Sequence, residues 1–150
     1  AEAHRDLLAL VKRQLTLGAA GVILETSHPL KLMSLMGSLP VRKAIYVPPP
    51  DEDARKHVIK QMLKGFLNDE SMENLARLTQ AYSLRNLTKL CDLIRNKMML
   101  GLRSEQAIAS ALSEVPGDLT WEEVFECEKF VESFKGVVMG FISAVSSVEG

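Results

Sequence analysis

The sequence has few cysteines and almost no net charge, and each scarcity excludes a class of protein. Cys91 and Cys127 are its two cysteines, and they lie far apart without C-x-x-C spacing. This pattern excludes a disulfide framework and is typical of a reduced, cytosolic type of chain. The formal net charge of −1 supplies no broad electrostatic field for nucleic acid. We therefore expect neither a disulfide-stapled fold nor a nucleic-acid partner.

Long apolar runs and common catalytic motifs are also missing. The apolar-rich tail at 136–148 contains glycines and serines, and it is shorter than the roughly 20 residues of a membrane span. The opening residues do not form a signal peptide. His4, His28 and His57 show no metal-ligand spacing with each other or with the cysteines, and H-E-x-x-H and G-x-S-x-G are absent. We expect no metal site, no membrane partner and a cytoplasmic location.

Two short apolar runs indicate a small parallel β element. Residues 22–24 and 44–47 are continuously apolar rather than alternating, as in strands covered on both faces. We predict that they are neighbouring parallel strands. Because working residues of such sheets lie at the carboxyl ends of strands, Thr26 and Ser27 become candidates for a site.

Helical periodicity and capping residues dominate the rest of the 150 residues, about one ordinary domain. Asp51, Ser71 and Ser83 are the expected N-caps, and Thr120 with Glu123 forms a capping box. The predicted helices cover 2–17, 30–36, 52–64, 71–82, 84–100 and 104–112, with a last helix after Thr120. The predicted fold class is mostly α with a small parallel β remnant, an α/β edge joined to a helical bundle.

Three stretches resemble the AAA+ ATPases. They are Thr26-Ser27-His28-Pro29, the run IYVPPPDEDAR at 45–55, and LARLTQAYS at 75–83. The first is similar to the T-N-R-P-like turn after a core strand, the second to a strand that leaves the core, and the third to the start of the helical lid. The resemblance covers roughly residues 5 to 115. It implies the C-terminal half of the AAA+ module, its last core strands plus the lid.

The resemblance divides the chain into three parts. Residues 1–50 would be the trailing part of a P-loop α/β core, 51–115 the helical lid, and 116–150 a C-terminal helix and docking extension. Two parallel strands and one helix cannot close a sheet. We therefore expect that a longer polypeptide or another protein chain supplies the missing N-terminal half, within a homo- or hetero-oligomer.

Thr26 and Ser27 match the position where the family places a polar residue, often asparagine, that orients the attacking water. The resemblance thus makes them sensor-1-like residues, although a serine would position a nucleophile poorly. The alternative is that both side chains cap the turn that follows.

The start of the predicted helix 84–100 is the second candidate site. Some AAA+ branches have a lid arginine here that touches the γ-phosphate, so the resemblance implies that Arg85, with Ser83 and Leu84, contacts nucleotide. Arg85 lies in the first turn of its helix, where the dipole disfavours a cation unless it has a partner such as phosphate. The alternative is a surface arginine that pairs with Glu73 or another acid.

Other family features are degenerate or absent. The arginine-finger positions match 36–40, which hold no arginine. Arg42 is either a displaced finger or, with Lys43, a solvent-exposed residue at the entrance to the strand 44–47. The chain has no G-x-x-x-x-G-K-[ST] and no apolar run ending in paired acids. Without a phosphate cradle and a magnesium carboxylate, the chain alone should not hydrolyse ATP. ATP and Mg²⁺ are expected cofactors of the complete module, and none is expected for this chain by itself.

For two apolar segments, the sequence does not decide between packing in a core and docking to a partner. The Met-rich 32–36 is either core or an adaptable partner surface. The aromatic series Phe125, Phe130, Phe134 and Phe141 is either core or a docking surface.

Three interpretations of function remain. The first is the lid and sheet edge of an AAA+ ATPase that contributes to nucleotide-dependent remodelling or assembly. The second is a non-catalytic AAA-like scaffold in a larger complex, with a cytoskeletal or axonemal location as one version. The third is a small helical adaptor with an accidental match, which predicts that 22–24 and 44–47 are not neighbouring parallel strands.

Overall fold

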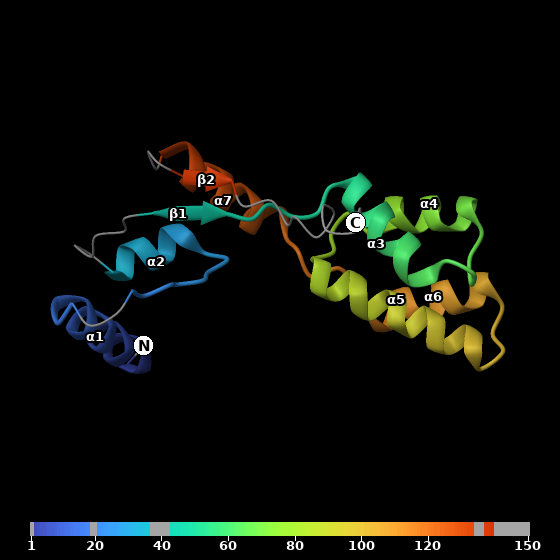
Figure 1. The fold of residues 1–150 in the computed structure, drawn as a ribbon, viewed down its shortest axis with the longest axis horizontal. Helices are drawn as coiled ribbons and strands as arrows, with labels where there is room; N and C mark the ends of the chain where they lie inside the picture. Colours follow the sequence, from blue (N-terminus) through green and yellow to red (C-terminus); the bar gives the residue numbers. More distant parts are fainter. Residues whose placement is uncertain (1, 19–20, 37–42, 134–136, 140–150) are drawn as a thin grey trace, which may run out of the picture. The chain divides into compact units, whose positions relative to one another are not determined.

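The computed structural model describes residues 2–18, 21–36, 43–133 and 137–139 (Figure 1). The chain divides into two compact units. Unit 1 comprises Ala1–Val47 with Phe125–Gly150, and unit 2 is Pro48–Val124. The first boundary falls immediately before the proline run at 48–50.

Unit 2 is a helical bundle of four consecutive helices. They are α3 (Glu52–Leu63), α4 (Asp69–Leu78), α5 (Leu84–Met99) and α6 (Ser104–Glu114). Helix α3 packs against α4 and α5, and α5 also packs against α6. Figure 1 shows this bundle in green to orange. The fold is thus mostly helical, as the sequence predicts.

The hydrophobic core of unit 2 follows from the helical spacing of its apolar residues. Side chains at i, i+3, i+4 and i+7 share one face of a helix, so each helix buries one stripe. Helix α5 contributes most, because it lies between α3 and α6. The buried apolar residues are Ile59, Leu63, Leu67, Met72, Leu75, Ala76, Tyr82, Leu87, Leu90, Cys91, Ile94, Ala107 and Ala111.

Side-chain caps fix where the helices of unit 2 begin. The Asp51 carboxylate accepts from the Ala54 N–H at 2.8 Å, and the Ser83 hydroxyl accepts from the Asn86 N–H at 3.2 Å. Both caps confirm the prediction. The predicted cap Ser71 is wrong, because the Asn68 side chain accepts from the Ser71 N–H at 2.8 Å and α4 begins at Asp69. Asparagine caps as well as serine does, and here it comes earlier in the chain.

Arg55 ties the start of α3 to the end of α4. Its side chain is 5% exposed. Its Nε donates to the carbonyl of Ala76 at 3.1 Å, and its Nη1 donates to the carbonyl of Pro50 at 2.8 Å. The carbonyls near the C-terminus of a helix lack intrahelical partners and carry the negative end of its dipole, so a guanidinium satisfies both needs. Arg55 therefore anchors the proline run to the bundle.

The described residues of unit 1 form helices α1 and α2, most of helix α7 and two short strands. Helix α1 is Glu2–Thr16 and α2 is Pro29–Met36, while β1 is Ala44–Tyr46 and β2 is Val137–Met139. Helix α7 (Trp121–Ser133) begins in the last residues of unit 2 and continues into unit 1. The two strands pair in parallel, with Ile45 opposite Val138.

The predicted strand at 22–24 is wrong. These residues form neither strand nor helix, and the Ile23 side chain is 96% exposed. The parallel partner of β1 is instead β2, which lies in the C-terminal segment that the sequence predicts to be a docking extension. Three apolar residues are too few to specify a strand, and the pairing of a strand depends on distant segments. This outcome matches what the adaptor interpretation predicts for these two segments.

Candidate functional site

The turn that precedes α2 holds the sensor-1-like residues. The hydroxyl of Thr26 accepts from the His28 N–H at 2.9 Å, an arrangement that closes a tight turn. Thr26 therefore caps the turn, as the alternative interpretation states. Ser27 is exposed, and its carbonyl faces the thiol of Cys127 in α7 with an Sγ–O distance of 3.5 Å.

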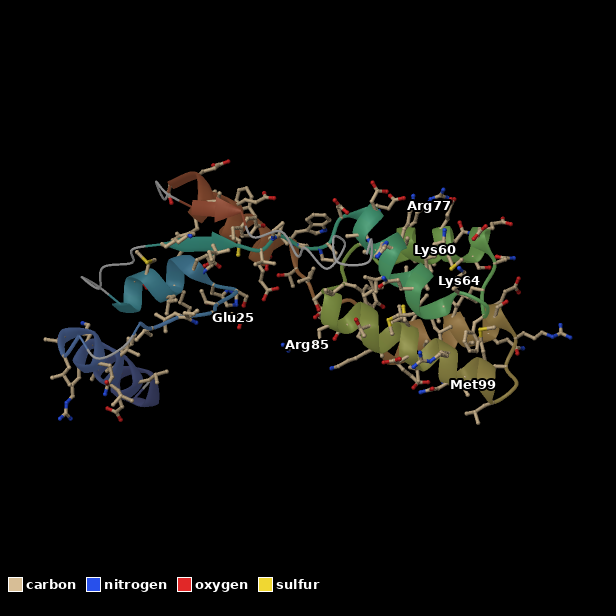
Figure 2. All side chains as sticks on the ribbon, in the orientation of Figure 1. Glu25, Lys60, Lys64, Arg77, Arg85 and Met99 are labelled. Carbon is tan, nitrogen blue, oxygen red and sulfur yellow. The ribbon has the colours of Figure 1, made fainter. Side chains whose placement is uncertain are left out.

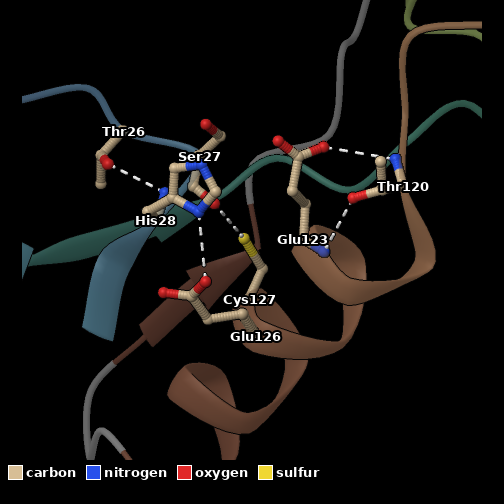
Figure 3. A network of polar contacts seen from close by, with 7 residues as sticks. All are labelled: Thr26, Ser27, His28, Thr120, Glu123, Glu126 and Cys127. Carbon is tan, nitrogen blue, oxygen red and sulfur yellow. Dashed lines mark hydrogen bonds and ion pairs between the residues drawn. The ribbon is translucent and has the colours of Figure 1, made fainter. Parts of the chain in front are cut away.

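Helix α7 also places a carboxylate at the start of α2 (Figure 3). A ring nitrogen of His28, Nδ1, lies 3.2 Å from Oε2 of Glu126. The backbone N–H groups of Leu30 and Lys31 also lower the pKa of this carboxylate, so its charge acts on the start of α2. The N-terminus of a helix attracts anions because its first N–H groups lack partners. In unit 1 that position is thus occupied by the chain's own Glu126.

The contact with His28 favours the ionised form of Glu126, and the pKa of Glu126 is lowered as a result. The hydrogen bond from His28 lowers the pKa below its ordinary value of 4.5 most strongly, and the N–H of Lys31, the charge of His28 and the N–H of Leu30 act in the same direction. Partial desolvation opposes them. Each donor stabilises the ionised carboxylate and none is satisfied as well by the protonated acid.

We expect acid to release this contact. Because the pKa is lowered, the contact stabilises unit 1 fully above pH 4.5, and its contribution is lost as the pH falls through the lowered value. An NMR titration should therefore show the amide resonances of Leu30 and Lys31 moving with a midpoint below 4.5. The movement should vanish in Glu126→Gln and persist in the control Glu132→Gln. Identical titrations in both variants would contradict the assignment.

Ser83 begins α5 and is the first predicted lid residue. Its N–H donates to Oδ1 of Asp118 at 2.8 Å, and its hydroxyl donates to Oδ2 of the same side chain at 2.6 Å. The hydroxyl also accepts from Asn86. Both donors of Ser83 are thus used inside the chain, so its hydroxyl has no proton left to offer a phosphate.

Arg85 differs from Ser83, because its guanidinium is available. Arg85 is exposed in the first turn of α5, and Figure 2 shows its side chain extending away from the helix. Within the described ranges it forms no hydrogen bond or ion pair. Glu73, the acid named as its alternative partner, instead pairs with Arg77, with 3.8 Å between Oε2 of Glu73 and Nη2 of Arg77. Leu84 is partly buried at the same turn.

A capping box begins α7. The Glu123 N–H donates to the hydroxyl of Thr120 at 3.3 Å, and the Thr120 N–H donates to Oε2 of Glu123 at 3.2 Å (Figure 3). The predicted capping box is confirmed. The capping box therefore fixes the residue at which α7 begins.

Two acids that contact the candidate turns were missed by sequence reasoning, Glu126 and Asp118. Neither belongs to a motif that requires it. The sequence places Asp118 in a Pro-Gly-Asp loop, and Glu126 is one of five glutamates in α7. Their roles depend on contacts across 35 and 98 residues, which periodicity and local spacing do not reveal.

Other candidate chemistry receives no support from the described geometry. No group of three or more metal-ligating side chains occurs among the described residues. Burial raises the pKa of Cys91 to about 12, so its thiol is not a nucleophile at neutral pH. Arg42 and the segment 37–40 lie outside the described residues, as do Phe134 and Phe141. None of the described helices is long and apolar enough to cross a membrane.

Comparison with known proteins connects the chain to one named relative. The chain is 31% identical over 114 residues to the Cell division cycle protein 48 homolog of Archaeoglobus fulgidus. The aligned region covers 63% of this chain and 16% of the archaeal protein. No family model matches the chain.

This similarity supports a relationship to the AAA+ ATPases. The chain corresponds to a small part of the archaeal protein, so the similarity concerns a module rather than a whole enzyme. The mostly helical fold with a small parallel β element agrees with the predicted fold class, although the strands that pair are β1 and β2 rather than 22–24 and 44–47.

Proposed function

We propose that this chain is the C-terminal part of an AAA+ module, sheet edge plus helical lid, and that it contributes to nucleotide-dependent remodelling or assembly. It does not act as a catalyst alone, since it has no phosphate cradle and no magnesium-binding acid pair. ATP and Mg²⁺ are bound mainly by the other half of the module. That half belongs to a longer polypeptide or to a partner chain of a homo- or hetero-oligomer.

The observation that carries the proposal is the state of Arg85. A cation in the first turn of a helix opposes the positive end of the dipole, which costs up to about 1 kcal/mol at an exposed position. Arg85 nevertheless occupies this position, and within the described residues no acidic side chain forms an ion pair with its guanidinium. A nucleotide phosphate would remove the penalty, because it interacts favourably with both the guanidinium and the helix N-terminus.

Unit 1 contributes differently. Ser27 is exposed beside the turn that Thr26 closes, and Glu126 neutralises the start of α2. A carboxylate at that place repels a phosphate. We therefore assign nucleotide contact to Arg85 in unit 2 and give the Ser27 turn a supporting role.

Replacing Arg85 with alanine should weaken nucleotide binding by the full-length protein about tenfold, the loss expected when one charge-assisted contact worth about 1.4 kcal/mol is removed. Titration with a fluorescent ATP analogue measures the change. Lys89 is the matched control, because it is exposed one turn further along α5 and also has no partner among the described residues. Equal effects of Arg85→Ala and Lys89→Ala would show a general charge effect and contradict the proposal.

A scaffold without nucleotide is the second candidate function. Two observations favour it: the self-occupied start of α2, and the exposed aromatics Trp121 (78%) and Phe125 (56%) on α7. Exposed aromatic side chains on a helix suit contact with another protein. This candidate predicts that the full-length protein binds no ATP and that Trp121→Ala weakens its assembly with partners.

A further inference from the structure

A loop in unit 2 is fastened to the turn that begins α5. The loop spans 115–119, between α6 and α7, and the turn spans 81–86. The backbone N–H of Leu119 donates to the carbonyl of Ala81 at 3.0 Å. From the turn, the Tyr82 hydroxyl donates to the carbonyl of Val115, and the Asn86 amide donates to the carbonyl of Pro116 at 3.2 Å. Asp118 adds its two bonds to Ser83.

Asp118 performs half of a capping box from outside the helix. In an ordinary capping box, a glutamate three residues into the helix accepts from the N–H of the cap residue. Here Asn86 occupies that position, and Asp118 accepts from the Ser83 N–H instead. Its second oxygen orients the Ser83 hydroxyl, which leaves the hydroxyl lone pairs for the Asn86 N–H. The first turn of α5 therefore depends on an acid 35 residues away.

The loop approaches so closely that no side chain fits at residue 117. A Cβ built on Gly117 would lie 2.7 Å from the carbonyl oxygen and 3.0 Å from the Cβ of Ala81. The obstacle is backbone, which cannot rotate away as a flexible side chain can. Alanine at 117 would push the loop, and Asp118 with it, away from Ser83.

From these contacts we infer that Asp118 is the positioning residue of Arg85. This inference rests on the proposed function. The direction of Arg85 is set by the backbone of the first turn, and that turn is fixed by the Ser83 cap. The carboxylate of Asp118 also supplies the negative charge that a helix N-terminus favours, which stabilises the first turn. Asp118 thus acts on nucleotide binding through Arg85.

A double-mutant cycle in the full-length protein tests this dependence. Asp118→Ala and Arg85→Ala should each weaken binding of the fluorescent ATP analogue about tenfold, and the double variant should bind no more weakly than Arg85→Ala. Asp118→Asn keeps an acceptor for the Ser83 N–H but loses the acceptor for the Ser83 hydroxyl and the charge, so it should recover only part of the affinity. Losses that multiply in the double variant, or no loss in Asp118→Ala, would overturn the inference.

Amide hydrogen exchange separates this inference from the proposed function. Asp118→Ala and Gly117→Ala should both speed exchange at Ser83 and Asn86 and leave the core amide of Ile94 unchanged. The control is Ser113→Ala, which lies outside the fastened loop and bonds only locally to the Ser110 carbonyl. If the wild-type protein binds no nucleotide, the proposed function fails, whereas the positioning of the turn fails only if exchange at Ser83 and Asn86 does not change.

Discussion

Replacing Arg55 with alanine is expected to lower the free energy of unfolding of the helical unit by about 3 kcal/mol. Arg55 is 5% exposed, and its guanidinium donates to the carbonyls of Ala76 and Pro50. Without it, the partly buried carbonyl of Pro50 loses this donor and the carbonyl of Ala76 keeps only the Thr79 hydroxyl at 3.2 Å, and an unsatisfied buried acceptor costs about 1 to 3 kcal/mol. The long side chain also leaves a space between α3 and α4. Chemical denaturation followed by circular dichroism measures the change.

Arg77→Ala is the matched control for Arg55. Arg77 lies at the exposed surface of α4, and its pairing with Glu73 at 3.8 Å is an ordinary surface ion pair. Its replacement should change stability by less than about 0.5 kcal/mol. Arg55→Lys should fall between the two, because an ammonium cannot reproduce the planar fork that reaches both carbonyls. Equal stabilities of the two alanine variants would show that Arg55 does not anchor the bundle.

Leu90→Ala is expected to destabilise unit 2 by about 3 kcal/mol. Leu90 is 0% exposed on α5, the helix that packs against both α3 and α6. Truncating a buried leucine removes favourable burial and leaves a cavity, at a cost of about 2 to 5 kcal/mol. Thermal unfolding monitored by circular dichroism gives the shift.

The control for Leu90 is Met99→Ala at the end of the same helix. Met99 is 71% exposed (Figure 2), so its truncation should change the melting temperature little. If Met99→Ala destabilised the protein as much as Leu90→Ala, the core of unit 2 would be wrongly assigned.

The helices of unit 2 could be predicted from the sequence because their signals are local. Apolar residues recur at helical spacing, and Asp51, Ser83 and the Thr120–Glu123 pair cap the helix that follows them within three residues. The start of α4 was missed because Asn68 and Ser71 are both good caps, and local chemistry does not choose between them.

The β element could be predicted only in part, since strand pairing is not local. The sequence predicts a strand at 44–47, and the structure has β1 at Ala44–Tyr46. Its partner lies more than 90 residues away at Val137–Met139. The glycines and serines of that tail do not favour a strand, so composition does not predict it. The run at 22–24 has the same apolar character as β1 but no ladder. Composition therefore indicates which segments suit a strand and leaves their partners undetermined.

The candidate site shows the same division. The resemblance directs attention to Ser27 and Arg85, and the alternative that Thr26 caps its turn follows from the residues themselves. What the sequence cannot reveal is that a distant acid approaches each turn, Glu126 at α2 and Asp118 at α5. These acids change the chemistry of both turns, because one neutralises a helix start and the other uses both donors of Ser83.

The central claim is that this chain serves a nucleotide-binding module through Arg85. Calorimetric titration of the purified full-length protein with MgATP tests it most directly. The account predicts saturable binding that is weakened about tenfold by Arg85→Ala and unchanged by Lys89→Ala. Absence of binding to the folded wild-type protein, or identical affinities of wild type and Arg85→Ala, would contradict it.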